Sequence, residues 1–564
     1  VREAEKYLDH GVENLWEMVT PQSLPRSFAV NLELGSPITG KEFLEEYGVY
    51  GWEADPLNDP WKLVDPSSGY KFPTNDFKSY YESGLNEHGI FDPKLADERY
   101  LVNELYPEKG EKWGVDDGFG WVDENGDKWT FIAYYNHWEL WHGGAIISAL
   151  NSFRDAYLYT GDMRYAHAGI ILLDRIADVY PDMDVSEYRE EDGFLNSHGG
   201  TGKGKVVGSI WETGAAWNYL AAYDAFFPAM EEADVVDFLS AKAEAYQMDN
   251  PKSSVEDIRR NIEDGILHEI FPAVKDAQIR GNFGMHQRTL AMAAVVLDEP
   301  GTSEKWIDWI FQSGELVSKP DWHLTGGDVL ATLVNDVDRD GFGNEASPEY
   351  NGYWLNQIQS VADILDGFDR YPEADLFDNV KFRKMFGTRY PLMMVGKYTP
   401  AIGDSGATGS PGLMGSVQEH VRAYEKFRTP VFAQVAYALN GNSTQGIHGD
   451  IFSSDPEKVA EDIQRIVDRD GSLHLNSTNL TGYGFTVLRQ GEGASEPFGH
   501  FPALDIVEAS VAHKIFEDSG TVQLEANEPG HYIAFAFDVP KTDTYEIDLK
   551  PFRAQSYGRY EIKI

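Results

Sequence analysis

The segment SIWETGAAWNYLAAYDAFF, residues 209–227, decides the fold class. At 3.6 residues per turn, its apolar side chains cover more than one face of a helix. A helix that is apolar almost all round must be covered by neighbours on several sides. Segments with helical spacing recur between about 130 and 470, separated by short loops rich in Gly, Asp and Pro. We predict helices at 136–160, 164–179, 209–226, 233–247, 253–269, 284–297, 302–314, 350–366, 379–386, 415–425, 429–439 and 455–468.

The number of these helices constrains their arrangement. They are too many for a four-helix bundle and fit an antiparallel array of helical hairpins, either a solenoid or a closed (α/α) toroid. No fixed-period consensus of the tetratricopeptide or HEAT type repeats along the chain, which argues against a regular solenoid. We therefore predict an (α/α) toroid over residues 126–470.

The regions on either side of the helical block have a different composition. Residues 1–125 are dense in Pro, Gly, Asp and Trp, and we expect a loop-rich segment packed on the toroid. Residues 471–502 begin a β-sheet domain, and 503–564 hold alternating runs separated by turns. The predicted fold class is α+β and multidomain: an N-terminal (α/α) toroid of helical hairpins followed by an antiparallel β-sheet or sandwich region.

Both ends of the chain fall inside a predicted secondary-structure element. The chain starts at Val1 inside an amphipathic helical pattern and stops at Ile564 inside a strand pattern. We expect a longer protein, with the remainder of the β domain beyond Ile564. Because a removed signal peptide leaves no trace, we also expect a secreted, periplasmic or cell-surface location.

Charge and composition exclude several classes of protein. With 47 basic and 93 acidic residues the formal net charge is −46, which is the wrong sign for a duplex-DNA binder. Hydrophobic residues at 42% rule out wholesale disorder, and no 18-residue apolar run is present to span a membrane. Cysteine is absent, so disulfides, thiolate metal sites and cysteine nucleophiles are excluded. An anionic substrate met by a local basic patch remains compatible with this charge.

The segment 278–290, QIRGNFGMHQRTL, gathers polar residues at the start of a predicted helix. Helix N-termini attract anions, and an amide and two guanidinium groups would add to that attraction. The alternative is an ordinary polar helix start in which a neighbour satisfies the histidine. The candidate residues are Arg280, Asn282, His286, Gln287 and Arg288.

The segment 336–355, DVDRDGFGNEASPEYNGYWL, allows two interpretations, of which the first is a calcium loop. Asp336, Asp338 and Asp340 match the first half of an EF-hand loop. The twelfth position is Ser347 rather than Glu, so the bidentate ligand of a structural Ca²⁺ site is missing.

The second interpretation of this segment is the start of a helix. Ser347 would cap the helix, Pro348 would occupy its first turn, and Tyr350 would lie at its mouth. A tyrosine held there can give or take a proton, whereas the alternative role is packing in the core.

The order of three motifs, GNFGMHQ, DGFGNEASPEYN and YGFTVLRQG, resembles the heparinase II/III-type polysaccharide lyases and their alginate- and uronate-lyase relatives. The resemblance covers roughly residues 130–490. It implies an (α/α) toroid followed by antiparallel β-sheet layers, and cleavage of a uronate-containing polysaccharide by β-elimination. It also implies that Asn282 neutralises the substrate carboxylate and that Tyr350 is the catalytic tyrosine.

Two features depart from the family pattern. Many relatives carry His directly after the asparagine, where this chain has Phe283, and His286 is our candidate for that role. The family also implies a histidine in the β domain, but no His-x-His-x-Asp-like run follows Arg489. Instead, residues 503–564 resemble a carbohydrate-binding β module that is truncated at Ile564.

The implied chemistry needs these residue types. β-Elimination from a 4-linked uronate removes the weakly acidic C5 proton next to a charged C6 carboxylate. An amide or cation bound to that carboxylate stabilises the enolate-like transition state, while a base takes the proton and an acid protonates O4. Asn282 as neutraliser, Tyr350 as acid or base and His286 as base or orienter would fill these roles. No metal or other cofactor is required.

Further side chains are expected to line a cleft for the polymer, although tryptophan on a toroid helix is also common in the core. The lysines of the glycine-rich loop 198–208 suggest a flexible basic rim. The segment 379–403, with five basic residues and no acidic one, is either a solvated helix face or a polyanion-guiding edge. The expected substrate-binding residues are Asn136, His137, Trp138, Lys203, Trp211, Glu212, Arg280, Gln287, Arg288 and Tyr353.

Two other functions stay open. An (α/α)-barrel glycoside hydrolase needs two carboxylates about 5–10 Å apart, and Glu212, Asp340, Glu345 and Asp404 are available for such a pair. A non-catalytic glycan-binding protein is the other alternative, because Phe283 stands at the usual histidine position. The expected partner is an anionic polysaccharide, without nucleic acid and without a membrane span.

Overall fold

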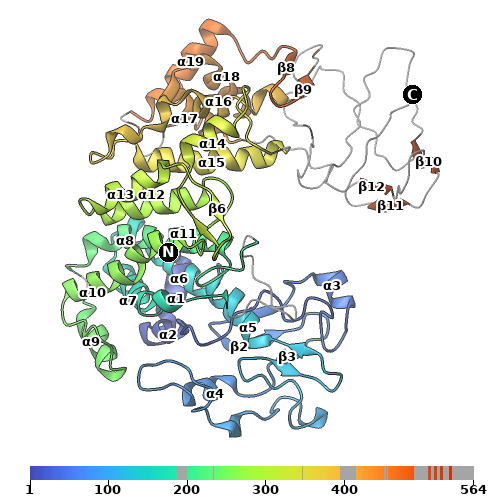
Figure 1. The fold of residues 1–564 in the computed structure, drawn as a ribbon, viewed down its shortest axis with the longest axis vertical. Helices are drawn as coiled ribbons and strands as arrows, with labels where there is room; N and C mark the ends of the chain where they lie inside the picture. The colour runs from blue at the N-terminus through green and yellow to red at the C-terminus, as the bar shows by residue number, and fades with distance from the viewer. Residues whose placement is uncertain are drawn as a thin grey trace. The chain divides into compact units, whose positions relative to one another are not determined.

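A computed structural model gives the fold of the chain (Figure 1). It describes residues 1–186, 200–232, 234–345, 347–393, 400, 415–449, 453, 455–487 and 489, together with the strands 506–509, 513–516, 521–524 and 533–535. The chain divides into two compact units. Unit 1 consists of residues 1–329 and 363–372, and unit 2 of residues 330–362 and 373–564. Helices make up most of the regular structure and short antiparallel strands the rest, which is compatible with the predicted α+β class.

The main part of unit 1 is a set of helices joined largely by short connections, so that several consecutive helices pack as pairs. Helix α6 packs on α7 and α8, α8 packs on α12, and α12 packs on α13. The expected helix 253–269 is divided by a π-helix, η7 (Glu263–Leu267). The helices are α6 (Ala145–Thr160), α7 (Met163–Val179), α8 (Ser209–Phe226), α9 (Val236–Ala245), α10 (Val255–Ile262), α11 (His268–Lys275), α12 (Met285–Leu297) and α13 (Thr302–Phe311).

Helix α7 illustrates why these segments fold as they do. Asp162 caps the helix, because its carboxylate accepts a hydrogen bond from the main-chain N–H of Arg164 at 3.0 Å. The apolar run that follows is buried almost without a break. Gly169 lets α7 approach α8, because a Cβ at this position would lie 2.2 Å from the ring of Phe226. Local capping thus sets where α7 begins, and close packing explains the glycine inside it.

The expected single helix 136–160 is wrong. Tyr135–Trp141 forms a π-helix, η3, and α6 begins only after a turn at two glycines. Gly143 has a φ of 72°, and a Cβ on Gly144 would lie 2.3 Å from the carbonyl group of Glu139. Only glycine fits this turn without strain. Short π-helical segments within helical stretches are frequent at functional sites.

The N-terminal segment contains short helices and small sheets in addition to its loops. Strands β1, β2 and β3 pair antiparallel in that order. Phe72 on β3 stacks on Phe131 on α5, with ring centroids 4.4 Å apart, so aromatic packing joins the sheet to the helices that follow. The elements are α1 (Arg2–His10), α2 (Val12–Met18), α3 (Glu42–Tyr47), α4 (Phe77–Ser83), α5 (Phe131–Tyr134), β1 (Glu53–Asp55), β2 (Asp59–Val64), β3 (Lys71–Phe72), β4 (Trp121–Val122) and β5 (Lys128–Trp129), with β6 (Leu316–Val317) and β7 (His323–Leu324) later in unit 1.

Unit 2 combines helices with antiparallel strand pairs. Helix α17 packs on α18, and α18 packs on α19. The strands expected after residue 470 are confirmed in part, because β8 pairs with β9, β10 with β13 and β11 with β12. The alternating runs expected after residue 535 lie outside the described residues. The elements of unit 2 and its boundary are α14 (Val329–Asn335), α15 (Pro348–Leu365), α16 (Val380–Met385), α17 (Val417–Phe427), α18 (Pro430–Leu439), α19 (Lys458–Asp470), β8 (Thr478–Leu480), β9 (Phe485–Val487), β10 (Ile506–Ala509), β11 (His513–Phe516), β12 (Thr521–Leu524) and β13 (Ile533–Phe535).

None of the helices in the described part of the chain combines the length and the apolar character needed to cross a bilayer. The expected domain boundaries after residues 125, 470 and 502 stay predictions.

Candidate functional site

The polar segment before α12 forms a tight turn that leads directly into the helix. Gly284 has a φ of 89°, and the main-chain N–H of Met285 donates to the carbonyl of Asn282 at 3.0 Å. Asn282 is exposed, whereas His286 and Gln287 in the first helical turn are buried. Since the free N–H groups at a helix start attract anions, an exposed amide at this position extends an anion-binding surface.

Helix α12 begins against the first turns of α8. The main-chain N–H of Arg280 donates to the carbonyl of Ser209 at 3.1 Å, and the Arg288 guanidinium lies 5.0 Å from the ring centre of Trp217. Burial lowers the pKa of Arg280 and of Arg288. Arginine nevertheless stays cationic at neutral pH, because its pKa starts far above that range. The starts of α8 and α12 therefore lie close together with two cations beside them.

His286 is held uncharged inside unit 1. Its side chain is 7% exposed, and Nδ1 has no hydrogen-bond partner within the described part of the protein. Burial, with a smaller contribution from the Arg280 cation, lowers the pKa of His286 to about 3. The imidazole is therefore neutral near pH 7, where it can make hydrogen bonds but is a weak base. Its neighbour Gln287 is anchored, because Nε2 donates to the carbonyl of Gly327 at 2.8 Å.

A cluster of rings surrounds the end of π-helix η3. Trp138 stacks on His142 with ring centroids 4.4 Å apart, and His142 lies 5.2 Å from Trp211 in the first turn of α8. Tyr50 lies 4.8 Å from Trp138. Trp211 is 45% exposed and Tyr50 is 52% exposed, so both offer ring faces for stacking. These four residues, Tyr50, Trp138, His142 and Trp211, are called the aromatic group below.

Two histidines in this region have unsatisfied ring nitrogens. Neither nitrogen of His137, and not Nδ1 of His142, has a hydrogen-bond partner among the described residues. Burial lowers the pKa of His137 well below 6.5 and that of His142 to about 4, so both are neutral near pH 7. The two rings lie 5.4 Å apart. Because these ring nitrogens are shielded from solvent, the two imidazoles are neutral groups inside unit 1 behind the exposed rings of Trp211 and Tyr50.

Two of the predicted binding residues hold loops together. Asn136 is fully buried, and its Nδ2 donates to the carbonyls of residues 24 and 25 at 3.1 and 3.0 Å. Glu212 is also fully buried, and its carboxylate accepts hydrogen bonds from Tyr180 Oη at 3.0 Å and from the N–H of Val207 at 2.9 Å. Both side chains therefore stabilise the loops of unit 1 from within its interior.

The two lysines of the glycine-rich loop are engaged within the protein, contrary to the expected basic rim. Lys203 Nζ lies 2.8 Å from the carboxylate of Asp321. Lys205 Nζ lies 3.1 Å from the carboxylate of Glu269, and its side chain is almost completely buried. Their charges are neutralised by these partners, so they fasten the loop rather than present free cations.

In unit 2, Tyr350 lies in the first turn of α15, as predicted. Ser347 Oγ accepts from the main-chain N–H of Glu349 at 3.1 Å and of Tyr350 at 3.4 Å, which confirms the predicted cap. The ring of Tyr353, which is 55% exposed, lies 5.8 Å from the ring of Tyr350. Because Asn282 and His286 belong to unit 1, their convergence with Tyr350 stays a prediction.

The carboxylates of the half EF-hand pattern bind main-chain amides. Asp338 Oδ1 accepts from the N–H groups of Asp340, Gly341 and Phe342 at 2.7, 2.8 and 3.0 Å. Asp340 Oδ2 accepts from the N–H of Gly482 at 2.6 Å. Within the ranges that the structure describes, no three His, Cys, Asp or Glu side chains gather closely enough to hold a metal ion. The pattern is thus explained by a tight turn that its own aspartates stabilise.

The basic residues around α16 brace neighbouring parts of unit 2. Lys381 and Lys384 donate to main-chain carbonyls of residues 337–339. Arg389 forms a buried ion pair with Glu419, with Nε 3.2 Å from the carboxylate. Lys381 and Arg389 are held inside unit 2, whereas Lys384 and Arg383 are exposed, so part of this helix has the expected solvated face and a polyanion-guiding edge stays a prediction. Two further predicted residues, Lys397 and Asp404, lie outside the described residues.

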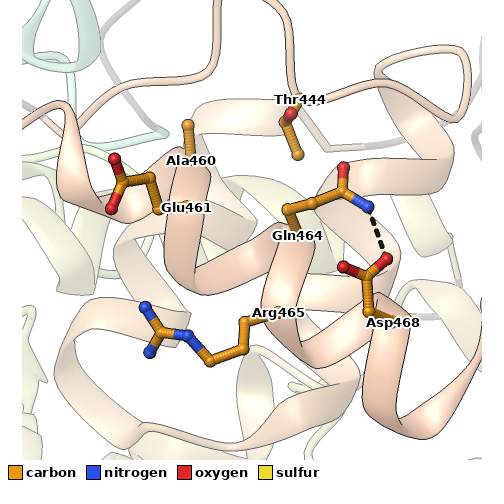
Figure 2. A pocket seen from close by; sticks show the side chains of 6 residues that line it. All are labelled: Thr444, Ala460, Glu461, Gln464, Arg465 and Asp468. Carbon is orange, nitrogen blue, oxygen red and sulfur yellow. Dashed lines mark hydrogen bonds between the residues drawn. The ribbon is translucent and has the colours of Figure 1, made fainter.

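A surface hollow over α19 lies apart from all these residues in sequence (Figure 2). Gln464 Nε2 donates to Asp468 one turn further along α19 at 2.8 Å (Figure 2). Arg465 is paired with Asp462 at 2.9 Å. Its lining carries both signs of charge and no aromatic ring, so it lacks the features of a uronate-binding site. The lining residues are Thr444, Ala460, Glu461, Gln464, Arg465 and Asp468.

Sequence reasoning missed Tyr50 and His142. Tyr50 lies in the loop-rich N-terminal segment, and no local pattern pairs it with Trp138. For His142 a signal was present, because HWELWHGG ends an aromatic run with two glycines. The two glycines mark the break after η3 that brings His142 between Trp138 and Trp211.

No protein-family model and no curated protein matches this chain.

Proposed function

We propose that the protein is a polysaccharide lyase that cleaves a uronic-acid-containing polysaccharide by β-elimination and leaves unsaturated uronate ends. One observation carries the proposal: an exposed amide, Asn282, precedes α12 beside Arg280 and the neutral His286, against the α8 turn that holds Trp211. Anion-binding groups next to stacking surfaces suit a sugar polymer that bears carboxylates. The resemblance of the motif order to heparinase II/III-type lyases supports the same function.

The proposed reaction breaks two bonds and forms a carbon–carbon double bond. A base removes the proton from C5, the electron pair forms the C4=C5 bond, and the C4–O4 bond breaks. An acid gives a proton to the departing O4, so atoms and charges balance without water. The rate depends on stabilising the negative charge that builds on the C6 carboxylate as the C5 proton leaves.

In this proposal each role falls to a named side chain. Asn282, with the helix start and Arg280 behind it, binds the C6 carboxylate. A pKa of about 3 makes His286 a weak base, which favours the orienting role over the base role. Tyr350, as tyrosinate, first accepts the C5 proton and then, as tyrosine, gives a proton to the departing O4. These roles require no metal or cofactor.

The finer architecture and the location belong to the same proposal. We infer that the helix pairs are hairpins of an (α/α) toroid over residues 126–470, followed by an antiparallel sandwich. The strands after residue 503 would form a carbohydrate-binding-like module. A secreted, periplasmic or cell-surface location would give the protein access to such a polymer.

A glycoside hydrolase has less support from the described carboxylates. The Glu212 carboxylate is bound by Tyr180 and Val207, and Asp340 binds the main-chain amides of residues 482 and 483. A hydrolase would need two carboxylates facing one glycosidic bond. A glycan-binding protein without turnover would use the same aromatic group and is distinguished by the test below.

The test is a screen of the purified chain against uronate polymers with different backbones. We expect the far-ultraviolet absorbance of the unsaturated uronate to grow with at least one polymer. Asn282→Ala should lower kcat by about 10²–10³-fold, as for the loss of one oxyanion-type donor. Tyr350→Phe should abolish elimination, while folding and polymer binding remain.

The matched control for Asn282→Ala is Gln278→Ala, which removes an amide from the same segment and should leave kcat unchanged. New reducing ends without the absorbance would identify a hydrolase, and binding without turnover would identify a glycan-binding protein. An unchanged rate in Asn282→Ala would remove Asn282 from the site. Retained elimination in Tyr350→Phe would contradict the role of Tyr350.

A further inference from the structure

We propose that the β8–β9 hairpin positions Tyr350, acting through Asp340 and Asn351. The inference rests on the proposed function for the chemical role of Tyr350, but every contact that carries it lies within unit 2. Asp340 and Asn351 are positioning residues, since each acts on the main chain that leads into α15.

The first link joins the hairpin to the loop before α15. Asp340 Oδ2 accepts hydrogen bonds from the main-chain N–H groups of Gly482 at 2.6 Å and Tyr483 at 3.3 Å. The ring of Phe342 stacks on that of Tyr483, with centroids 3.9 Å apart and planes at 9°. Gly482 allows a close approach at the tip, because a Cβ there would lie 2.9 Å from Asp338 Cγ. A carboxylate, a ring pair and a glycine contact thus fix the hairpin tip on the loop.

The second link joins the same loop to α15. Asn351 Oδ1 accepts from the N–H of Gly343 at 2.5 Å, and its Nδ2 donates to the carbonyls of Glu345 at 2.8 Å and Ser347 at 3.0 Å. Asn351 is 4% exposed, so these hydrogen bonds are shielded from water. The residue directly after Tyr350 therefore fastens the helix start to the loop that the hairpin holds.

Helix α16 also braces this loop. Lys384 Nζ donates to the carbonyl of Arg339 at 2.8 Å, and Lys381 Nζ donates to the carbonyl of Asp338 at 3.1 Å. The loop is thus held by a helix and by a hairpin, and its contact with the hairpin includes a stacked aromatic pair. A displacement of about 1 Å can lower a reaction rate by about 10²-fold. A fixed position of this loop is therefore important for a tyrosine that must reach O4.

The first arm of the test needs no catalysis. Hydrogen exchange is measured by mass spectrometry on the full chain carrying Asp340→Ala, with Asn344→Ala, an exposed residue of the same loop, as the control. We expect the amides of residues 347–355 to exchange about tenfold faster in Asp340→Ala than in the wild type, and at the wild-type rate in Asn344→Ala. The exchange rates of α18 and α19 should not change in either variant. Unchanged exchange at 347–355, or equally faster exchange throughout unit 2, would overturn the inference.

The second arm uses the uronate polymer that the screen identifies. Asp340→Ala should lower kcat by about 10- to 100-fold with KM within about twofold. Asp340→Asn should recover most of this loss, because its carboxamide oxygen can still accept the hairpin N–H groups. A raised KM with unchanged kcat would overturn the positioning role. If no polymer is cleaved, the proposed function fails, whereas the exchange arm still decides whether the hairpin holds the Tyr350 turn.

Discussion

Histidines of this chain differ in what they can do because they differ in burial. His88 is exposed on the surface, whereas His286 is 7% exposed and His137 is 1% exposed. Placing a cation in an apolar environment is costly, so burial favours the neutral imidazole. A neutral imidazole can still make hydrogen bonds, and both buried rings have a nitrogen without a hydrogen-bond partner within the described structure. The candidate site is therefore rich in hydrogen-bonding groups that do not change charge near pH 7.

This burial predicts a pH dependence of stability. The pKa of His286 is about 3 in the folded protein and about 6.5 in the unfolded chain. Between these values the unfolded chain binds the proton more readily, so the free energy of unfolding falls as the pH drops below about 6.5. From pH 7 to pH 5 this single group should cost about 2 kcal/mol. Urea unfolding of the wild type and of His286→Gln at both pH values measures the difference, and the variant should lose about 2 kcal/mol less.

The control is Asn344→Ala, which changes an exposed residue without a titratable side chain and should keep the pH dependence of the wild type. An identical pH dependence in the wild type and in His286→Gln would show that His286 is protonated at its ordinary pKa in the folded protein.

Helix packing in unit 1 depends on where glycine stands within a helix. Gly169 on α7 faces Phe226 on α8 so closely that a Cβ would lie 2.2 Å from the ring. Gly214 on α8 has no atom within 4 Å of a Cβ position. The first glycine is needed for close approach, whereas the second is not needed for packing. The same helix pair therefore supplies both a test and its control.

Alanine at these two positions should have opposite effects on stability. Gly169→Ala should lower the free energy of unfolding by about 1–3 kcal/mol, because the added methyl group overfills a packed interface. Gly214→Ala should raise it by up to about 1 kcal/mol, because alanine favours the helix more than glycine does. Urea unfolding at pH 7 measures both. Equal changes in the two variants would contradict the close packing of α7 on α8.

The negative charge of the whole molecule is distributed unevenly between surface and interior. Among the described residues, the buried acidic side chains are few, namely Asp65, Asp116, Asp174 and Glu212. Most of the 93 acidic residues must therefore contribute to a surface field that repels itself and repels polyanions. Within the described structure, Arg280 and Arg288 beside the starts of α8 and α12 would supply local positive charge to the proposed substrate.

This distribution predicts two salt effects of opposite sign. The Debye length falls from about 10 Å at 0.1 M salt to about 3 Å at 1 M. Salt should screen the repulsion between acidic side chains of the protein and therefore raise its melting temperature by roughly 5 °C between 0.1 and 1 M salt. Binding of a uronate polymer should weaken over the same range, because Arg280 and Arg288 act through charge. Calorimetry and binding titrations in NaCl, repeated in KCl, measure both effects, and a flat or falling melting temperature would contradict the first.

The sequence by itself determined where most helices lie. Segments such as 209–226 and 164–179 carry their spacing, caps and terminating Pro or Gly within a few residues, so α8 and α7 appear close to the predicted positions. The Ser347 cap and the place of Tyr350 on α15 were predicted for the same reason. The π-helix η3 was not, because the glycines that break the helix act through close contacts of the folded main chain.

Only the tertiary structure decided which polar groups are free and which are engaged. Lys203 is neutralised by Asp321, and Asp340 is bound by the N–H of Gly482. These partners lie more than a hundred residues away in the chain, so no local spacing reveals them. The burial of His286, and hence its neutral state, likewise depends on what packs over it. Helical periodicity and capping residues depend on positions that are close together in the sequence. Burial, ion pairing and the aromatic group instead arise from contacts that form only when the whole chain has folded.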